Sequence, residues 1–200
     1  MLLRIRMKKH LFITGYPGCG KTDLLREELG AAAAYAGGFI TVPECDGTGK
    51  LLTCSLFPAS ALIGTEGYDG QVFLDCREDA PLHNNEVFRA EGVRLLRESG
   101  YYPFTVLDGF GGFDLLVPQY REALTEVLNN DRPVIGVFMD KKGADTLKAL
   151  LGLSDRFTMI TDNMRKVIAA DSDTEVVTMH GRGDFLARRA VRRWVSEFVR

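Results

Sequence analysis

The sequence predicts a three-layer α/β/α domain whose mostly parallel sheet carries a small antiparallel strand insertion. Three observations support this fold class. An apolar run over residues 10–14 leads through a glycine-rich loop into a helical pattern. From residue 84 onward, helical patterns alternate with short apolar runs, the order of crossovers in a parallel sheet. Between them, residues 37–80 contain short strand-like runs separated by turn-rich pieces, which indicates antiparallel pairing.

Composition favours one domain over residues 1–200, because 46% hydrophobic and 26% charged residues suffice for a single core. The net charge of -2 argues against nucleic acid as the main partner. No segment resembles a signal peptide or approaches the roughly 20 apolar residues of a membrane span, so we expect no membrane partner. Four unevenly spaced cysteines without a CxxC pair fit reduced thiols and a cytoplasmic location. No pattern indicates an oligomeric state.

The first half of the chain supplies the loop and the insertion. We expect a strand over residues 10–14, a helix over 22–29 and short strands over 39–42, 51–57 and 71–75. Gly37 and Gly38 are expected to end the first helical region, since glycine is a poor helix residue. The short strands predict a small flap or hairpin over about residues 37–80.

The second half predicts the parallel part of the sheet. We expect helices over residues 87–99, 118–128, 144–151 and 184–199, with another beginning at Asn163. The strands expected between them cover residues 103–107, 133–139, 157–161 and 176–179. No internal repeat or low-complexity linker interrupts this alternation.

The glycine-rich loop matches the phosphate-binding pattern GxxxxGK[ST] at eight consecutive positions. These are Gly15, Tyr16, Pro17, Gly18, Cys19, Gly20, Lys21 and Thr22. Glycines let the backbone turn its N–H groups toward an anion, and the following helix offers its positive end. Lys21 is expected to reach the β- and γ-phosphates of ATP or GTP, and Thr22 to bind Mg²⁺ through its hydroxyl. Asp23 follows in the first helical turn, close to the expected phosphates.

A second acid is needed to hold Mg²⁺ at the end of a neighbouring strand. Asp108 follows the apolar run FTVL and is the best Walker B candidate. The alternative is an aspartate that only caps the turn before Gly109. Because the phosphate loop is present, the metal-binding interpretation is favoured.

Three stretches of the chain resemble a known family, the small nucleoside-triphosphatases first described in thermophiles and also called cancer-related nucleoside-triphosphatases. GYPGCGKTDLL is similar to the family's phosphate loop, and GGFIT to its Gly-Phe-x-Thr strand. LDGFGGFDLLVPQYREALTEVLNNDRPVIGVF is similar to its Asp-Glu-Ile-Gly-x-Met-Glu-Leu segment with the helix and strand that follow. The resemblance implies a P-loop NTPase fold and Mg²⁺-dependent hydrolysis of nucleoside triphosphates with loose base preference.

Two positions in the last stretch bear on the rate of hydrolysis. The family has Glu directly after the Walker B aspartate, where this chain has Gly109. That Glu is the residue expected to orient or deprotonate the attacking water. The family's second acid is matched by Asp114, which is expected to take over water positioning. The predicted catalytic residues are therefore Lys21, Asp108 and Asp114, and hydrolysis is expected to be slow.

Two other functions remain open from the sequence. The tripeptide Asp108-Gly109-Phe110 with a GxPGxGK loop is also similar to nucleoside monophosphate kinases, although no Pro-Arg or arginine-rich lid follows it before residue 156. A kinase acting on a nucleotide or small molecule is therefore the first alternative. The second is a nucleotide-dependent binding switch that lost turnover through Gly109.

Several further side chains have both a functional and a structural interpretation. Asp140 follows the strand VIGVFM, where a polar residue can sense the γ-phosphate, or it is a loop residue. Asn163 is expected to open a helix, either near the nucleotide or as an ordinary N-cap. The last helix carries an apolar stripe that includes Phe185 and Trp194, with arginines opposite, which fits core packing beneath a charged face.

Overall fold

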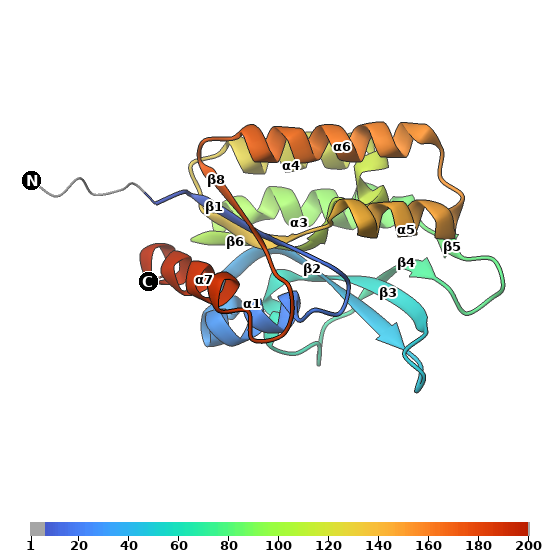
Figure 1. Ribbon diagram of the computed structural model, residues 1–200, viewed down its shortest axis with the longest axis horizontal. Helices are drawn as coiled ribbons and strands as arrows, with labels where there is room; N and C mark the ends of the chain where they lie inside the picture. The colour runs from blue at the N-terminus through green and yellow to red at the C-terminus, as the bar shows by residue number, and fades with distance from the viewer. Residues whose placement is uncertain (1–6, 200) are drawn as a thin grey trace, which may run out of the picture.

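One eight-stranded sheet organises residues 7–199, the part of the chain that the computed structural model describes (Figure 1). Its strand order is β5-β4-β3-β2-β6-β7-β1-β8. The strands are β1 (His10–Thr14), β2 (Ala36–Cys45), β3 (Leu51–Pro58), β4 (Gln71–Asp75), β5 (Leu82–His83), β6 (Phe104–Phe110), β7 (Val134–Phe138) and β8 (Thr174–Thr178). Strands β2, β6, β7, β1 and β8 pair in parallel, and β3, β4 and β5 extend the sheet in antiparallel pairing.

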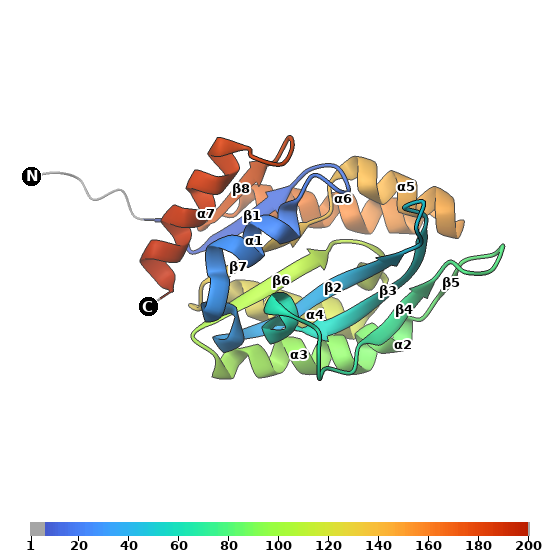
Figure 2. The same ribbon diagram turned by 90° about the horizontal axis from the view of Figure 1, so that it is seen from below.

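Helices cover both faces of the sheet and give three layers, as expected from the sequence (Figures 1 and 2). They are α1 (Lys21–Leu29), α2 (Asn85–Val87), α3 (Val93–Glu98), α4 (Pro118–Asn129), α5 (Lys141–Leu151), α6 (Asp155–Ala170) and α7 (Phe185–Phe198). Helices α1 and α7 pack on one face, with Leu25 and Trp194 in that core. Helices α3 to α6 cover the other face, with Tyr120 and Phe157 in that core. Among the helices of residues 7–199, none has the length and apolar character that crossing a bilayer requires.

The parallel strand order determines which loops meet. Strand β1 lies between β7 and β8, and β6 lies beyond β7. Parallel strands end at the same edge of a sheet, so the segments that follow β1, β6, β7 and β8 all emerge together. This edge is where the phosphate loop begins.

The antiparallel insertion expected at residues 37–80 is present, but it continues the main sheet. Strand β2 starts at Ala36 and pairs with β6 before β3 turns back along it. Gly37 and Gly38 therefore lie inside β2, and the prediction that they end a helix is wrong. A Cβ atom at Gly38 would lie 2.2 Å from the Val106 carbonyl oxygen, so the close approach of β2 and β6 requires glycine there.

Residues 157–161 form part of helix α6, and the predicted strand is wrong. The short segment FTMIT, in which Phe157, Met159 and Ile160 are apolar, fits a strand as well as a helix when it is considered alone. In the structure, Phe157, Thr161 and Ile168 lie on the buried side of one continuous helix, whereas Met159 is 72% exposed. This helical spacing, together with a length of 16 residues, distinguishes α6 from a strand.

The C-terminal arginines form ion pairs within the chain. Arg188 pairs with Glu27 and Glu28 of α1, and Arg192 also pairs with Glu28. The apolar stripe of α7 is buried at Trp194, as expected, but Phe185 at the start of the helix is 71% exposed. Two arginines of this face therefore hold α7 against α1.

Candidate functional site

The phosphate loop connects β1 to α1 in the strand–loop–helix order that the motif requires. It turns through left-handed φ values at Gly15, Gly18 and Gly20, which L-residues rarely adopt. Helix α1 begins at Lys21, immediately after the last of these glycines. The loop therefore places unpaired helix N–H groups at its own concave side, where an anion binds favourably.

Lys21 is folded back over the loop. Its Nζ atom donates hydrogen bonds to the carbonyl oxygens of Gly15 at 2.7 Å and Tyr16 at 2.8 Å. It also lies 3.6 Å from the Sγ atom of Cys19, a side chain that is only 1% exposed. The ammonium group thus sits within the loop and is held there by two carbonyl oxygens.

Asp108 lies inside β6 and is only 1% exposed. Burial raises the pKa of its carboxyl group from 3.8 to about 6, while the Thr22 hydroxyl, a hydrogen-bond partner, and the Lys21 ammonium oppose this rise. The Oδ2 atom of Asp108 is buried and has no hydrogen-bond partner among the described residues. A buried oxygen without a partner is costly unless a ligand or ion satisfies it.

The pair formed by Thr22 and Asp108 fits Mg²⁺. Both residues offer oxygen atoms, the ligand type that Mg²⁺ prefers, and Mg²⁺ sites commonly combine one or two protein groups with phosphate oxygens and water. The proximity of the Thr22 hydroxyl to Asp108 places the two oxygens on the α1 side of the sheet. Sequence reasoning named both residues, and the fold brings them together.

Gly109, which stands where the resembling family has Glu, lies in a β-bulge. The pairing of β6 with β7 shifts register between Asp108 and Phe110, and Gly109 has a φ of 91°. A Cβ atom at this position would lie 1.9 Å from the Oγ1 atom of Thr41. The backbone and its neighbour therefore exclude a side chain at residue 109, a conflict that the motif did not reveal.

Asp114, predicted to position the attacking water, also holds the backbone of its own turn. Its carboxylate accepts hydrogen bonds from the amide of Gly111 at 3.1 Å and from the amide of Gly112. Burial raises the pKa of this carboxyl group to about 6, and burial together with the Asp114 charge raises the pKa of Tyr120. Since Tyr120 belongs to the core on the α3–α6 face, the Asp114 carboxylate lies beside that core. Both carboxylate oxygens of Asp114 are engaged by backbone amides, and water positioning by this residue stays a prediction.

Asp23 forms two ion pairs beside the loop. One carboxylate oxygen accepts from Arg26 at 3.0 Å, and the other accepts from Arg182 at 3.1 Å. These cations offset the repulsion that Asp23 would exert on a nearby phosphate. Arg182 was not among the predicted site residues, because it follows the last strand and is brought to the loop only by the fold.

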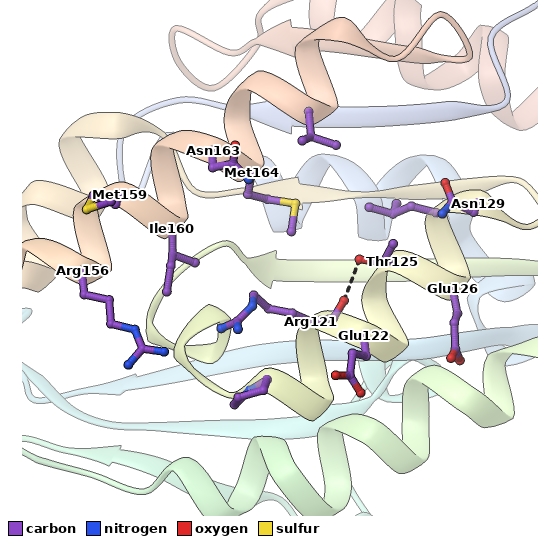
Figure 3. A pocket seen from close by; sticks show the side chains of 13 residues that line it. Arg121, Glu122, Thr125, Glu126, Asn129, Arg156, Met159, Ile160, Asn163 and Met164 are labelled. Atoms are coloured by element: carbon purple, nitrogen blue, oxygen red, sulfur yellow. Dashed lines mark hydrogen bonds between the residues drawn. The ribbon is translucent and has the colours of Figure 1, made fainter.

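Asn163 lies within α6, and Asp140 lies between β7 and α5. Asn163 lies in the middle of α6, where it lines a groove of about 910 Å³ between α4 and α6 together with Arg121 and Arg156 (Figure 3). No residue of the phosphate loop lines this groove. The prediction that Asn163 opens a helix is wrong, because α6 begins at Asp155. Asp140 caps α5, because its side chain accepts a hydrogen bond from the Gly143 amide at 2.7 Å.

Comparison with known proteins agrees with this geometry. A family model described as NTPase matches residues 10–171, which include the phosphate loop and Asp108. The crystal structure of THEP1 from the hyperthermophile Aquifex aeolicus shares the fold, with a TM-score of 0.62 and 14% identity over 96% of this chain and 99% of that chain. No curated protein gives a significant match. The chain therefore belongs to the NTPase family and has its three-layer P-loop fold.

Proposed function

We propose that the protein binds nucleoside triphosphates, ATP or GTP, together with Mg²⁺ and hydrolyses them slowly. The observation that carries this proposal is the juxtaposition of Thr22 with Asp108, whose buried Oδ2 atom has no partner among the described residues. The phosphate loop lies directly beside this pair. Family membership supports triphosphatase chemistry, and the oxygen ligands support Mg²⁺ as the metal.

Phosphate binding requires a movement of one side chain. The amides of the loop and of the first turn of α1 hold the phosphate oxygens. Lys21 then exchanges the carbonyl oxygens of Gly15 and Tyr16 for β- and γ-phosphate oxygens. Thr22 and Asp108 hold the metal, which when bound neutralises charge on the phosphates. Asp108 must be ionised for this role.

Slow turnover follows from the environment of two residues. The bulge at Gly109 carries no side chain to orient water, and Thr41 fills the adjoining space. The carboxylate of Asp114 is occupied by two backbone amides. These observations favour a second candidate function, a nucleotide-dependent binding switch with little or no turnover.

Calorimetry and phosphate release test both functions. Purified protein is titrated with ATP and with GTP, with and without millimolar Mg²⁺, and phosphate release is followed in parallel. Binding that needs Mg²⁺ with slow release supports the triphosphatase, and binding without release supports the switch. Loss of binding in Lys21→Ala is expected in either case. Absence of binding heat for both nucleotides, or release only with a phosphorylated acceptor as product, would overturn the proposal.

A further inference from the structure

The strand order gives a bound triphosphate a direction. The phosphate loop follows β1, and Asp108 lies on β6, beyond β7 on one side of β1. On the other side of β1 is β8, followed by residues 179–184. If the metal-bound β- and γ-phosphates lie toward Asp108, the nucleoside end of the molecule points toward β8. This step rests on the proposed function.

A polar cleft lies on the β8 side of the phosphate loop, between α1 and the segment after β8. Its volume is about 420 Å³, and it opens beside Gly20 at the end of the phosphate loop. Helix α1 contributes Asp23 and Glu27 to one wall, and the segment after β8 contributes Met179 and Arg182 to the other. Figure 2 shows α1 and α7 on this face of the sheet. The cleft has room for a base and a ribose, and its polar lining consists of carboxylates paired with arginines, Asp23 with Arg182 and Glu27 with Arg188.

Arg182 lines this cleft and contacts the phosphate loop. A Cβ atom at Gly20 would lie 3.0 Å from the Cγ atom of Arg182, so the arginine stem rests against the phosphate loop. Its guanidinium group donates to Asp23 at 3.1 Å, yet the side chain remains 80% exposed. An exposed planar guanidinium held at one edge can stack on the face of a base.

The segment that carries Arg182 is fixed at both ends. The Met179 amide donates to the carbonyl oxygen of Thr14 at 2.8 Å, which ties the segment to β1 just before the phosphate loop. Asp184 accepts from the His180 amide at 3.0 Å and from the Leu186 and Ala187 amides at the start of α7. A short segment anchored in this way can position a side chain without further ordering.

We infer that this cleft binds the nucleoside part of the substrate and that the guanidinium of Arg182 stacks on the base. Stacking uses the π-face that every base has, so adenine and guanine nucleotides both fit this contact. The residue acts in binding the nucleoside, separately from the groups that hold the phosphates.

Inorganic tripolyphosphate separates this contact from phosphate binding. Affinities of Mg²⁺-ATP, Mg²⁺-GTP and Mg²⁺-tripolyphosphate are measured by calorimetry for wild type and Arg182→Ala. We expect the variant to bind both nucleotides about tenfold or more weakly and tripolyphosphate as wild type does. Arg182→Lys keeps the charge but loses the planar group, and it is expected to bind nucleotides as weakly as Arg182→Ala.

Two further variants complete the test. Arg193→Ala removes another arginine paired with a carboxylate, Glu175 on β8, and is expected to bind all three compounds as wild type does. Lys21→Ala is expected to lose all three, and its failure to do so would count against phosphate binding at the loop rather than against the nucleoside cleft. Equal loss of tripolyphosphate affinity in Arg182→Ala, unchanged nucleotide affinity, or full rescue by Arg182→Lys would overturn the stacking contact.

Discussion

The side chain of Thr41 on β2 fills the space that a side chain at Gly109 on the adjacent strand β6 would need. The Oγ1 atom of Thr41 lies 1.9 Å from the position that a Cβ atom would take at Gly109, and Gly109 has a left-handed φ of 91°. A side chain at one position therefore requires a smaller residue at the other. This relationship means that the glutamate of the resembling family cannot be restored here by one substitution.

Gly109→Glu alone is expected to destabilise the protein by about 2–5 kcal/mol, because the overlap with Thr41 and the left-handed backbone both oppose the new side chain. The melting temperature should fall by roughly 5–15 °C. Gly47→Glu is a matched control, since a Cβ at Gly47 meets no atom within 4 Å. A melting temperature for Gly109→Glu equal to that of the control would contradict the overlap.

Thr41→Gly/Gly109→Glu is the variant that tests the missing general base. Removing the Thr41 side chain gives room for the new carboxylate, so part of the lost stability should return. Where the variants are folded, phosphate release by the double variant should exceed that of Thr41→Gly by about tenfold or more, the lower range of general-base catalysis. A folded double variant with no gain in rate would show that a carboxylate at residue 109 does not assist hydrolysis.

Asp108→Asn is expected to stabilise the nucleotide-free protein at pH 8. The pKa of Asp108 in the folded state is about 6, above its ordinary value of 3.8. Its contribution to the free energy of unfolding is therefore favourable at low pH and is lost as pH rises through 6. The free energy of unfolding of the variant should exceed that of wild type by up to about 3 kcal/mol at pH 8 and should equal it near pH 4. Thermal denaturation across this range measures the gain. Asp145→Asn on exposed α5 should show no comparable trend.

Nucleotide affinity should also depend on the protonation state of Asp108. A protonated Asp108 cannot attract Mg²⁺, so the Mg²⁺-dependent affinity for ATP should fall as pH decreases below about 6. Calorimetry between pH 5 and 8 measures the slope. Asp108→Asn controls for protonation of the nucleotide itself, because it lacks the carboxyl group. If wild type and this variant show the same pH profile, Asp108 does not bind the metal.

Asp114 variants separate a structural role from a catalytic one. Asp114→Ala leaves the amides of Gly111 and Gly112 buried without their acceptor and should cost about 2–4 kcal/mol in stability. Asp114→Asn retains one acceptor and should cost less. At a temperature where Asp114→Asn is folded, kcat and KM should stay within about threefold of wild type. A large loss of kcat at unchanged KM and stability would restore the water-positioning role.

Much of the parallel architecture was predictable because apolar periodicity is a local property. The strand before the phosphate loop, helix α1 and the antiparallel pairing of β3 and β4 follow the sequence expectations. The short run at residues 157–161 was assigned wrongly, since a five-residue segment with apolar Phe157, Met159 and Ile160 fits a strand and a helix equally. Only contact with the sheet shows which residues of this run are buried.

The sequence alone determined the phosphate loop and the presence of a strand aspartate, Asp108. The loop residues are contiguous, so glycine conformations and the following helix N-terminus suffice to specify their local geometry. Tertiary structure decided which distant side chains lie beside these residues: Thr41 beside Gly109, and Arg182, which contacts Asp23 from 159 positions away. These contacts depend on strand order and on one β-bulge, which arise from packing across the whole sheet rather than from any short segment.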